Sequence, residues 1–209
     1  MPFYKKISLQ HNTSVYLWKI NEEISDLKKD LFLSEVSLNR LEKMKSSNHV
    51  KGFLAVRKLL NMANYSDADL FYDAFGKPFL KDGKHISISH SHDFACVIIS
   101  ENHVGIDIEL KNEKIIKNAT LLFDEDFILT FKGSLEETKT LTTFCWGIKE
   151  AIFKILPEND VSFKDNISIK PFQLNESSCV VNVTFNNKIT SYTVQLKEIE
   201  NYVLAYVIQ

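Results

Sequence analysis

The fold of this chain is decided by the stretch Val104-Gly105-Ile106-Asp107-Ile108-Glu109. Apolar side chains recur at every second position, which is the period of a β-strand, so Gly105, Asp107 and Glu109 share the opposite face. Two carboxylates at this period lie roughly 7 Å apart. The stretch therefore predicts a strand whose polar face can hold one divalent cation, provided that a third ligand is supplied from elsewhere.

A second stretch reads Trp146-Gly147-Ile148-Lys149-Glu150-Ala151-Ile152-Phe153-Lys154 and has the period of an α-helix. One broad face is apolar and is typical of a core stripe; it consists of Phe144, Cys145, Ile148, Ala151, Ile152 and Ile155. The opposite face holds Trp146, Glu150, Phe153 and Lys154, with Lys149 at its flank. Because a surface helix rarely exposes a Trp and a Phe, we expect a ligand or another segment to cover this face.

Each motif alone has a simpler interpretation. Glu150 and Lys154 can form a solvated i,i+4 pair, and Asp107 and Glu109 can be the polar side of a half-exposed strand. Taken together, the three carboxylates and the nearby lysines predict a magnesium site beside a phosphate-binding site. Neither Asp107 nor Glu150 is assigned to the core, so we expect substitutions there to leave the fold intact.

The order G-I-D-I-E, about forty residues, then W-x-x-K-E-A-x-x-K resembles the 4′-phosphopantetheinyl transferase superfamily. Three upstream segments extend the resemblance over about residues 52–155, in the family's order; they are Arg57 in a basic helix, the G-K-P of Phe75-Gly76-Lys77-Pro78-Phe79, and the S-H-S of Ile86-Ser87-Ile88-Ser89-His90-Ser91. The length of 209 residues fits the two-lobed, surfactin-synthetase-activating (Sfp) type. One departure is Gly147, where the family more often has a small hydroxyl residue or alanine.

The resemblance implies an α+β fold of two similar lobes, each with antiparallel strands packed against helices, related by a pseudo-twofold. We expect the N-terminal lobe at residues 1–103 and the C-terminal lobe at 104–209, tightly packed because no flexible linker separates them. The pattern along the chain agrees with this repeat. It predicts strands at Ser14–Ile20, His85–Ser89 and Phe94–Ser100, helical pattern over 22–64 with Ser34 as a cap, helices at 124–132 and 137–156, and strands at 179–185, 189–196 and 202–209, with a turn at Asn186-Asn187.

The same resemblance implies transfer of the phosphopantetheine arm of coenzyme A to a serine of an apo-acyl or peptidyl carrier protein, with Mg²⁺ (or Mn²⁺) as the metal. Asp107, Glu109 and Glu150 are expected to bind the metal, and Glu150 is also the expected base. Lys154 would neutralise pyrophosphate charge, while Lys149 would assist it or orient Glu150.

Coenzyme A needs further cationic contacts, because the six glycines of the chain form no phosphate-binding loop. By resemblance these contacts are Arg57, Lys77, Ser89 and His90, together with Lys154. A two-lobed chain supplies both walls of a cleft, so we expect a monomer.

Bulk properties restrict the other possibilities. A formal net charge of −2 argues against a nucleic-acid-binding protein, and no apolar run has the length of a membrane span. Three scattered cysteines predict core residues in a reducing cytoplasm. Two alternatives stay open at this point: another Mg²⁺-dependent phosphoryl-transfer enzyme such as a nuclease, and a non-catalytic paralogue that binds carrier proteins.

Overall fold

The computed structural model describes residues 3–116, 133–157 and 160–209. The chain folds as two compact units, Met1–Val104 and Gly105–Gln209, which are called unit 1 and unit 2. Each unit contains antiparallel strands and a helix that packs against them. The predicted α+β class is therefore confirmed.

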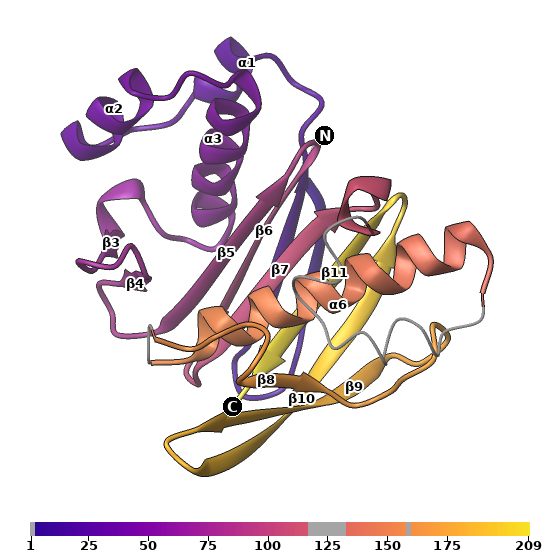
Figure 1. The fold of residues 1–209 in the computed structure, drawn as a ribbon. Helices are drawn as coiled ribbons and strands as arrows, with labels where there is room; N and C mark the ends of the chain where they lie inside the picture. Colours follow the sequence, from indigo (N-terminus) through magenta and orange to yellow (C-terminus); the bar gives the residue numbers. More distant parts are fainter. Residues whose placement is uncertain (1–2, 117–132, 158–159) are drawn as a thin grey trace. The chain divides into compact units, whose positions relative to one another are not determined.

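Unit 1 is built on a four-stranded sheet with the strand order β1-β2-β6-β5. Its strands are paired antiparallel throughout; their bounds are β1 Phe3–Ser8, β2 Ser14–Lys19, β5 His85–Ser91 and β6 Phe94–Ser100. Helix α3, Ser47–Met62, packs against this sheet (Figure 1). All seven residues of β6, an interior strand of the sheet, are buried.

The helical pattern predicted over 22–64 is present as three helices, α1 Ile24–Lys28, α2 Glu35–Glu42 and α3. Ser34 caps α2 as predicted, because its side chain accepts the N–H of Ser37. The chain then adds a short 3₁₀ helix, η1 Asp67–Asp69, and a small hairpin of β3, Leu70–Tyr72, and β4, Pro78–Leu80. The sequence did not predict β1 or this hairpin.

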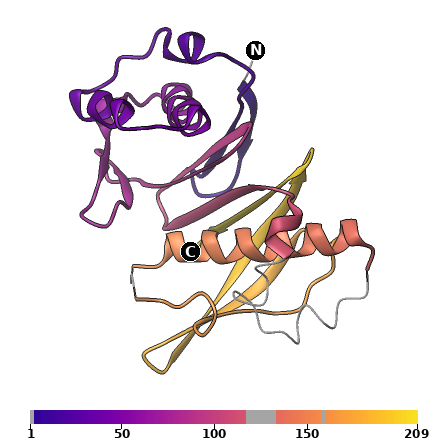
Figure 2. The same cartoon turned by 45° about the horizontal axis from the view of Figure 1, so that its top comes forward.

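Unit 2 holds a five-stranded sheet with the order β7-β11-β10-β9-β8 and one long helix. The elements are β7 Val104–Leu110, α6 Leu135–Ile155, β8 Ile167–Ile169, β9 Ser178–Phe185, β10 Lys188–Ile199 and β11 Tyr202–Ile208. Helix α6 runs along the sheet and contacts β11, the neighbour of β7 (Figure 2). A capping box begins α6: Ser134 accepts the N–H of Glu137, and Glu137 accepts that of Ser134.

The core of unit 2 lies between α6 and the sheet. All six residues of the predicted apolar stripe of α6 are buried there, which confirms the helical phase read from the sequence. Asn186 and Asn187 both have positive φ in the β9–β10 hairpin, as a tight type I′ turn requires. Strand β8 was not predicted, and the helix predicted at 124–132 lies outside the described residues. The three cysteines are buried, as predicted.

None of the helices described is long and apolar enough to cross a membrane.

Candidate active site

The close approach of α6 to β7 depends on a glycine. A Cβ on Gly105 would lie 1.9 Å from the carbonyl oxygen of Ala151, so only glycine lets the helix backbone reach the strand here. Gly105, Asp107 and Glu109 share one face of β7 by their spacing. The face that carries the two carboxylates is therefore the face on which α6 lies.

Asp107 is the centre of this contact. It is 2% exposed, so the expectation that it lies outside the core is wrong. Its Oδ1 is 2.7 Å from the Nζ of Lys154, which also donates to the carbonyl of Ile106 at 3.1 Å. Its buried Oδ2 points toward Gly147, where a Cβ would lie 3.5 Å away. The strand carboxylate and the helix ammonium thus form one charged pair.

Glu150 lies one turn before Lys154 on α6, and Glu109 lies two residues after Asp107 on β7. Burial raises the pKa of Glu150, Lys154 lowers it, and Asp107 raises it further, so these three charges belong to one electrostatic cluster. Glu109 accepts a hydrogen bond from Nε1 of Trp146 at 3.2 Å. The structure therefore gathers Asp107, Glu150 and Lys154, and ties Glu109 to α6 through an indole.

The donor set has the chemistry that Mg²⁺ requires. Carboxylate oxygens are the hard ligands that this ion prefers, and burial raises the pKa of Glu150 although Lys154 acts to lower it. Within the part of the chain that the structure describes, no three acidic, histidine or cysteine side chains are placed to hold a metal ion. The predicted ligand triad of Asp107, Glu109 and Glu150 stays a prediction.

Lys149 takes a different direction from Lys154. Its side chain is buried, and its Nζ donates to the carbonyl oxygens of Phe163 and Ile167, the latter at 2.8 Å. The ring of Phe163 in turn stacks on Trp146 and packs against Phe153. Another part of the chain thus covers the aromatic residues of this helix face, which is one of the two outcomes expected from the sequence.

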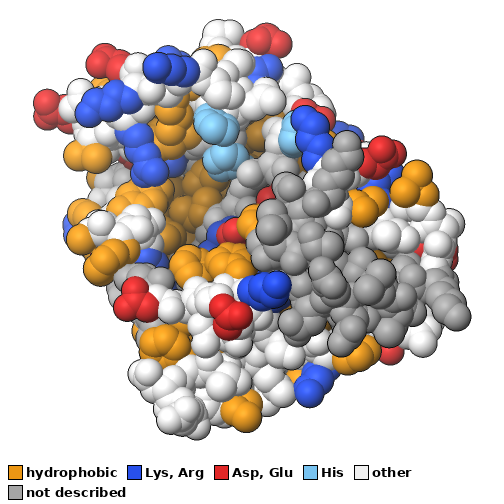
Figure 3. Space-filling view, in the orientation of Figure 1, with side chains coloured by type: hydrophobic (Ala, Val, Ile, Leu, Met, Phe, Trp, Pro, Cys, Tyr) orange, Lys and Arg blue, Asp and Glu red, His pale blue; other side chains and the backbone are white. Residues whose placement is uncertain are grey.

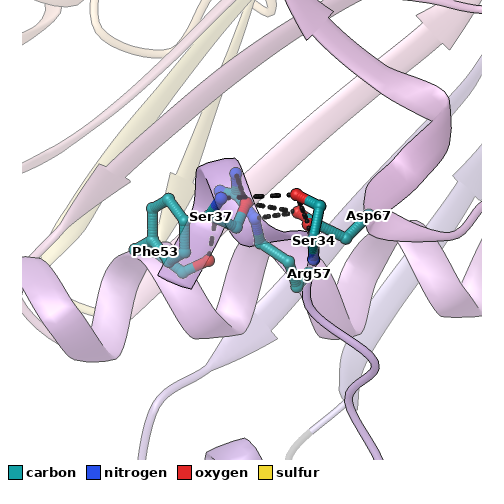
Figure 4. A network of polar contacts seen from close by, with 5 residues as sticks. All are labelled: Ser34, Ser37, Phe53, Arg57 and Asp67. Atoms are coloured by element: carbon teal, nitrogen blue, oxygen red, sulfur yellow. Dashed lines mark hydrogen bonds and ion pairs between the residues drawn. The ribbon is translucent and has the colours of Figure 1, made fainter. Parts of the chain in front are cut away.

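Arg57 is buried inside unit 1, at 3% exposed. Its Nε donates to Oδ1 of Asp67 at 2.9 Å, and its guanidinium carbon lies 3.4 Å from the ring centroid of Phe53 (Figure 4). Asp67 also accepts hydrogen bonds from Ser34 and Ser37, which belong to the start of α2. The guanidinium predicted to bind phosphate is therefore engaged in a network that joins α2, α3 and η1.

His90 is the exposed member of the predicted coenzyme A set, and Ser89 before it in β5 is buried. The imidazole lies directly over Gly52 of α3, where a Cβ would be 2.7 Å from both Cγ and Nδ1 of the ring. The exposed His49 ring is nearby, with its centroid 6.2 Å from that of His90. Histidine and lysine or arginine side chains are visible at the surface in Figure 3.

Lys77 lies in the turn between β3 and β4. The backbone N–H groups of Lys77 and Phe75 both donate to Oδ1 of Asp73 at 2.9 Å, and Gly76 takes a φ of +85°, which a side chain would disfavour. Lys77 also acts on His85, whose pKa is lowered by burial, by His103 and by Lys77. The G-K-P segment is thus a rigid turn that presents a half-exposed lysine.

Sequence reasoning did not assign a role to Gly52, His49 or Phe163. Gly52 carried a signal, because glycine in a helix interior costs about 1 kcal/mol relative to alanine and usually has a packing reason. Phe163 lies in an irregular segment with no periodic pattern, and His49 becomes noticeable only when α3 lies beside β5.

Comparison with known proteins agrees with this geometry. The family model of the 4′-phosphopantetheinyl transferase superfamily matches residues 103–207, which include β7, α6 and the rest of the unit 2 sheet. The chain is also similar to the 4′-phosphopantetheinyl transferase gsp of Aneurinibacillus migulanus, with 32% identity over 109 residues. That match covers 50% of this chain and 46% of the relative, so the chain matches about half the length of its curated relative. The chain belongs to the 4′-phosphopantetheinyl transferase superfamily.

Proposed function

We propose that the protein transfers the 4′-phosphopantetheine moiety of coenzyme A to a serine of an apo-acyl or peptidyl carrier protein. The products are holo-carrier protein and adenosine 3′,5′-bisphosphate. The observation that carries the proposal is the charged cluster of Asp107, Glu150 and Lys154 at the contact of α6 with β7, inside the region that matches the family.

In this reaction the serine Oγ bonds to the β-phosphorus of coenzyme A, and the bond from that phosphorus to the bridging oxygen breaks, so the bisphosphate leaves with the electron pair. Negative charge grows on the phosphoryl oxygens, and fixed cations stabilise it. Mg²⁺, when held by Asp107, Glu109 and Glu150, supplies further Lewis-acid stabilisation of that charge.

The chain's own residues divide the remaining work. Glu150 accepts the serine proton, and its half-buried position keeps it basic, because burial raises its pKa. Lys154 holds the Asp107 carboxylate at 2.7 Å and keeps its ammonium partly exposed, where it can meet pyrophosphate oxygens. Trp146 orients Glu109 by its indole N–H.

Coenzyme A is proposed to be gripped by His90, Ser89 and Lys77 of unit 1. The exposed imidazole of His90 can donate a hydrogen bond to a phosphate oxygen, and the half-exposed ammonium of Lys77 is a cation that suits phosphate. Arg57 fits this proposal less well, because its guanidinium is buried and already forms an ion pair with Asp67. A monomeric, Mg²⁺-dependent and cytoplasmic enzyme completes the proposal.

The test is a transfer assay read by the mass of the carrier protein. Incubation with coenzyme A, Mg²⁺ and apo-carrier should add one phosphopantetheine group to the carrier, and EDTA should prevent it. A carrier whose acceptor serine is replaced by alanine is the matched control. Binding of coenzyme A without mass gain on any acyl or peptidyl carrier would instead identify a non-catalytic paralogue.

Gly52→Ala is expected to weaken coenzyme A use without harming the fold. The new methyl group would lie 2.7 Å from Cγ and Nδ1 of the exposed His90 ring and must displace it, while alanine in a helix interior is favoured over glycine by about 1 kcal/mol. Loss of one hydrogen bond to a charged phosphate should raise the KM for coenzyme A about tenfold with kcat little changed. His92→Asn is the control, because this exposed neighbour has a φ of 47° that asparagine tolerates. An unchanged KM would show that His90 does not contact coenzyme A.

A further inference from the structure

We propose that Lys149 is a positioning residue that acts through the covering segment, residues 161–167, to fix the carboxylate of Glu109. The inference rests on the proposed function for what Glu109 does, but its structural part stands on contacts within unit 2. It assigns to the first lysine of W-x-x-K-E-A-x-x-K a role that is separate from that of Lys154.

The first step is the placement of the Lys149 ammonium. Its side chain is buried on α6, and its Nζ donates to two backbone carbonyls of the covering segment, those of Phe163 and Ile167. A buried charge costs several kcal/mol unless it is hydrogen-bonded, and hydrogen bonds from a charged donor are the strong ones. The ammonium therefore binds the backbone of the segment to the helix.

The second step is the rigidity of the segment itself. Asn166 closes the turn, because its Oδ1 accepts the N–H of Ser162 at 2.7 Å while its own N–H donates back to the Ser162 carbonyl at 3.1 Å. The same asparagine is paired with Thr184 of β9 through two hydrogen bonds. Hydrogen bonds thus tie the segment to β9 through Asn166 and to α6 through Lys149.

The third step leads from the segment to the carboxylate. The Phe163 ring stacks on Trp146 with a centroid distance of 5.7 Å and an interplanar angle of 25°. It also packs against Phe153 at 5.1 Å. The indole so held donates from Nε1 to Oε1 of Glu109 at 3.2 Å. If Glu109 holds Mg²⁺, a carboxylate whose partner is fixed in this way would already be oriented for the metal.

Loss of the Lys149 ammonium should therefore affect the Mg²⁺ concentration that transfer requires more than it affects turnover. Lys149→Met keeps an unbranched apolar side chain in the buried space but releases the two carbonyls. The Mg²⁺ concentration for half-maximal transfer should rise about tenfold, as for the loss of other groups that orient metal ligands. Turnover at saturating Mg²⁺ should stay within about threefold of the parent, since Lys149 does not touch the reacting atoms.

The experiment uses Trp146 as its own reporter. The chain has two tryptophans, so Trp18→Phe gives a parent protein in which emission comes from Trp146 alone. In this parent, Lys149→Met and Phe163→Leu should both shift the emission to longer wavelength in the absence of metal and coenzyme A, and both should raise the Mg²⁺ requirement. Lys164→Met is the matched control, because it removes an exposed lysine from the same segment.

Two results separate the claims. If Lys149→Met lowers turnover at saturating Mg²⁺ while emission and Mg²⁺ requirement are unchanged, Lys149 is a catalytic residue and the inference is overturned. If the parent transfers nothing but both variants still shift the emission, the covering segment is positioned as inferred and the proposed function fails instead. If Lys149→Met does not fold, Phe163→Leu is compared with the parent instead. Unchanged emission and an unchanged Mg²⁺ requirement in Phe163→Leu would also overturn the inference.

Discussion

Asp107→Asn is expected to lower kcat/KM for phosphopantetheine transfer about 10³-fold, the size of effect seen when a preorganised charge-stabilising group is lost. Asparagine keeps the shape of the side chain and an oxygen that can accept from Lys154, but it removes the negative charge. The Nζ of Lys154 lies 2.7 Å from Oδ1 of Asp107, and Asp107 is almost fully buried, so Lys154 compensates that charge directly. The proposed metal ligand and the partner of the lysine proposed to bind phosphate are lost together.

Asparagine is chosen because alanine would confuse chemistry with folding. Asp107→Ala would leave a cavity beside Gly147 and remove the acceptor of a partly buried ammonium, and both effects destabilise. The expectation that Asp107→Ala leaves the fold intact assumed a side chain outside the core, whereas Asp107 is 2% exposed. With asparagine, circular dichroism should still show a folded protein, while the melting temperature falls because Lys154 loses its charged partner.

Steady-state kinetics at saturating coenzyme A and Mg²⁺ measure the effect. Glu198→Gln is the matched control, since it removes a carboxylate from another ion pair of unit 2, that with Lys111, on a half-exposed glutamate. It should leave turnover unchanged. If Asp107→Asn keeps near-normal turnover while folded, the carboxylates of β7 serve only the structure, and the proposed mechanism fails.

The periodic parts of the site could be predicted from the sequence. Alternation in β7 and the 3.6-residue stripe in α6 depend on local geometry, so both elements and the buried face of the helix were identified correctly. The burial of Asp107 could not be predicted in the same way. It depends on how near α6 comes to β7, and that distance is set by the missing side chain of Gly105.

Contacts between side chains that lie far apart in the sequence could not be predicted either. Nothing in the pattern around Trp146 indicates that an irregular segment will cover it with Phe163. The helical pattern over 22–64 likewise gave no sign of where it breaks; the break after α1 includes Asp30 at a φ of 60°. Resemblance assigned Arg57 to phosphate, but which anion a buried arginine meets is decided by the fold, and here that anion is Asp67.

The second large effect is expected in stability, from Asp67→Asn. The Asp67 carboxylate accepts hydrogen bonds from Ser34, Ser37 and Arg57, and the pair with Arg57 is almost fully buried on both sides. Removing one charge of a buried pair leaves the other uncompensated and costs about 3–5 kcal/mol. Urea unfolding of the whole chain measures this loss. Glu23→Gln, which breaks the exposed pair with Lys51, should cost less than about 1 kcal/mol.

The pH dependence of the same variant has a definite sign. Burial alone would raise the pKa of Asp67, but the hydrogen bonds from Ser34, Ser37 and Arg57 outweigh it and the pKa is lowered. A carboxyl with a lowered folded pKa stabilises the protein above its unfolded pKa of about 3.9, and this contribution is lost as the pH falls through the folded value. The stability gap between the parent and Asp67→Asn should therefore be full at neutral pH and narrow below about pH 4. A gap that does not change with pH would contradict the ionised pair.

A double variant then decides what Arg57 does. Replacing a buried ion pair by apolar residues of similar volume is often neutral or stabilising, so Arg57→Met with Asp67→Leu should recover much of the stability that Asp67→Asn loses. If Arg57 serves only the network of α2, α3 and η1, the KM for coenzyme A of this double variant should equal that of the parent. If Arg57 also binds phosphate, the KM should rise about tenfold in a protein that is stably folded. Stability and KM thus separate two roles that the buried position of Arg57 and its place in the family motif assign to one side chain.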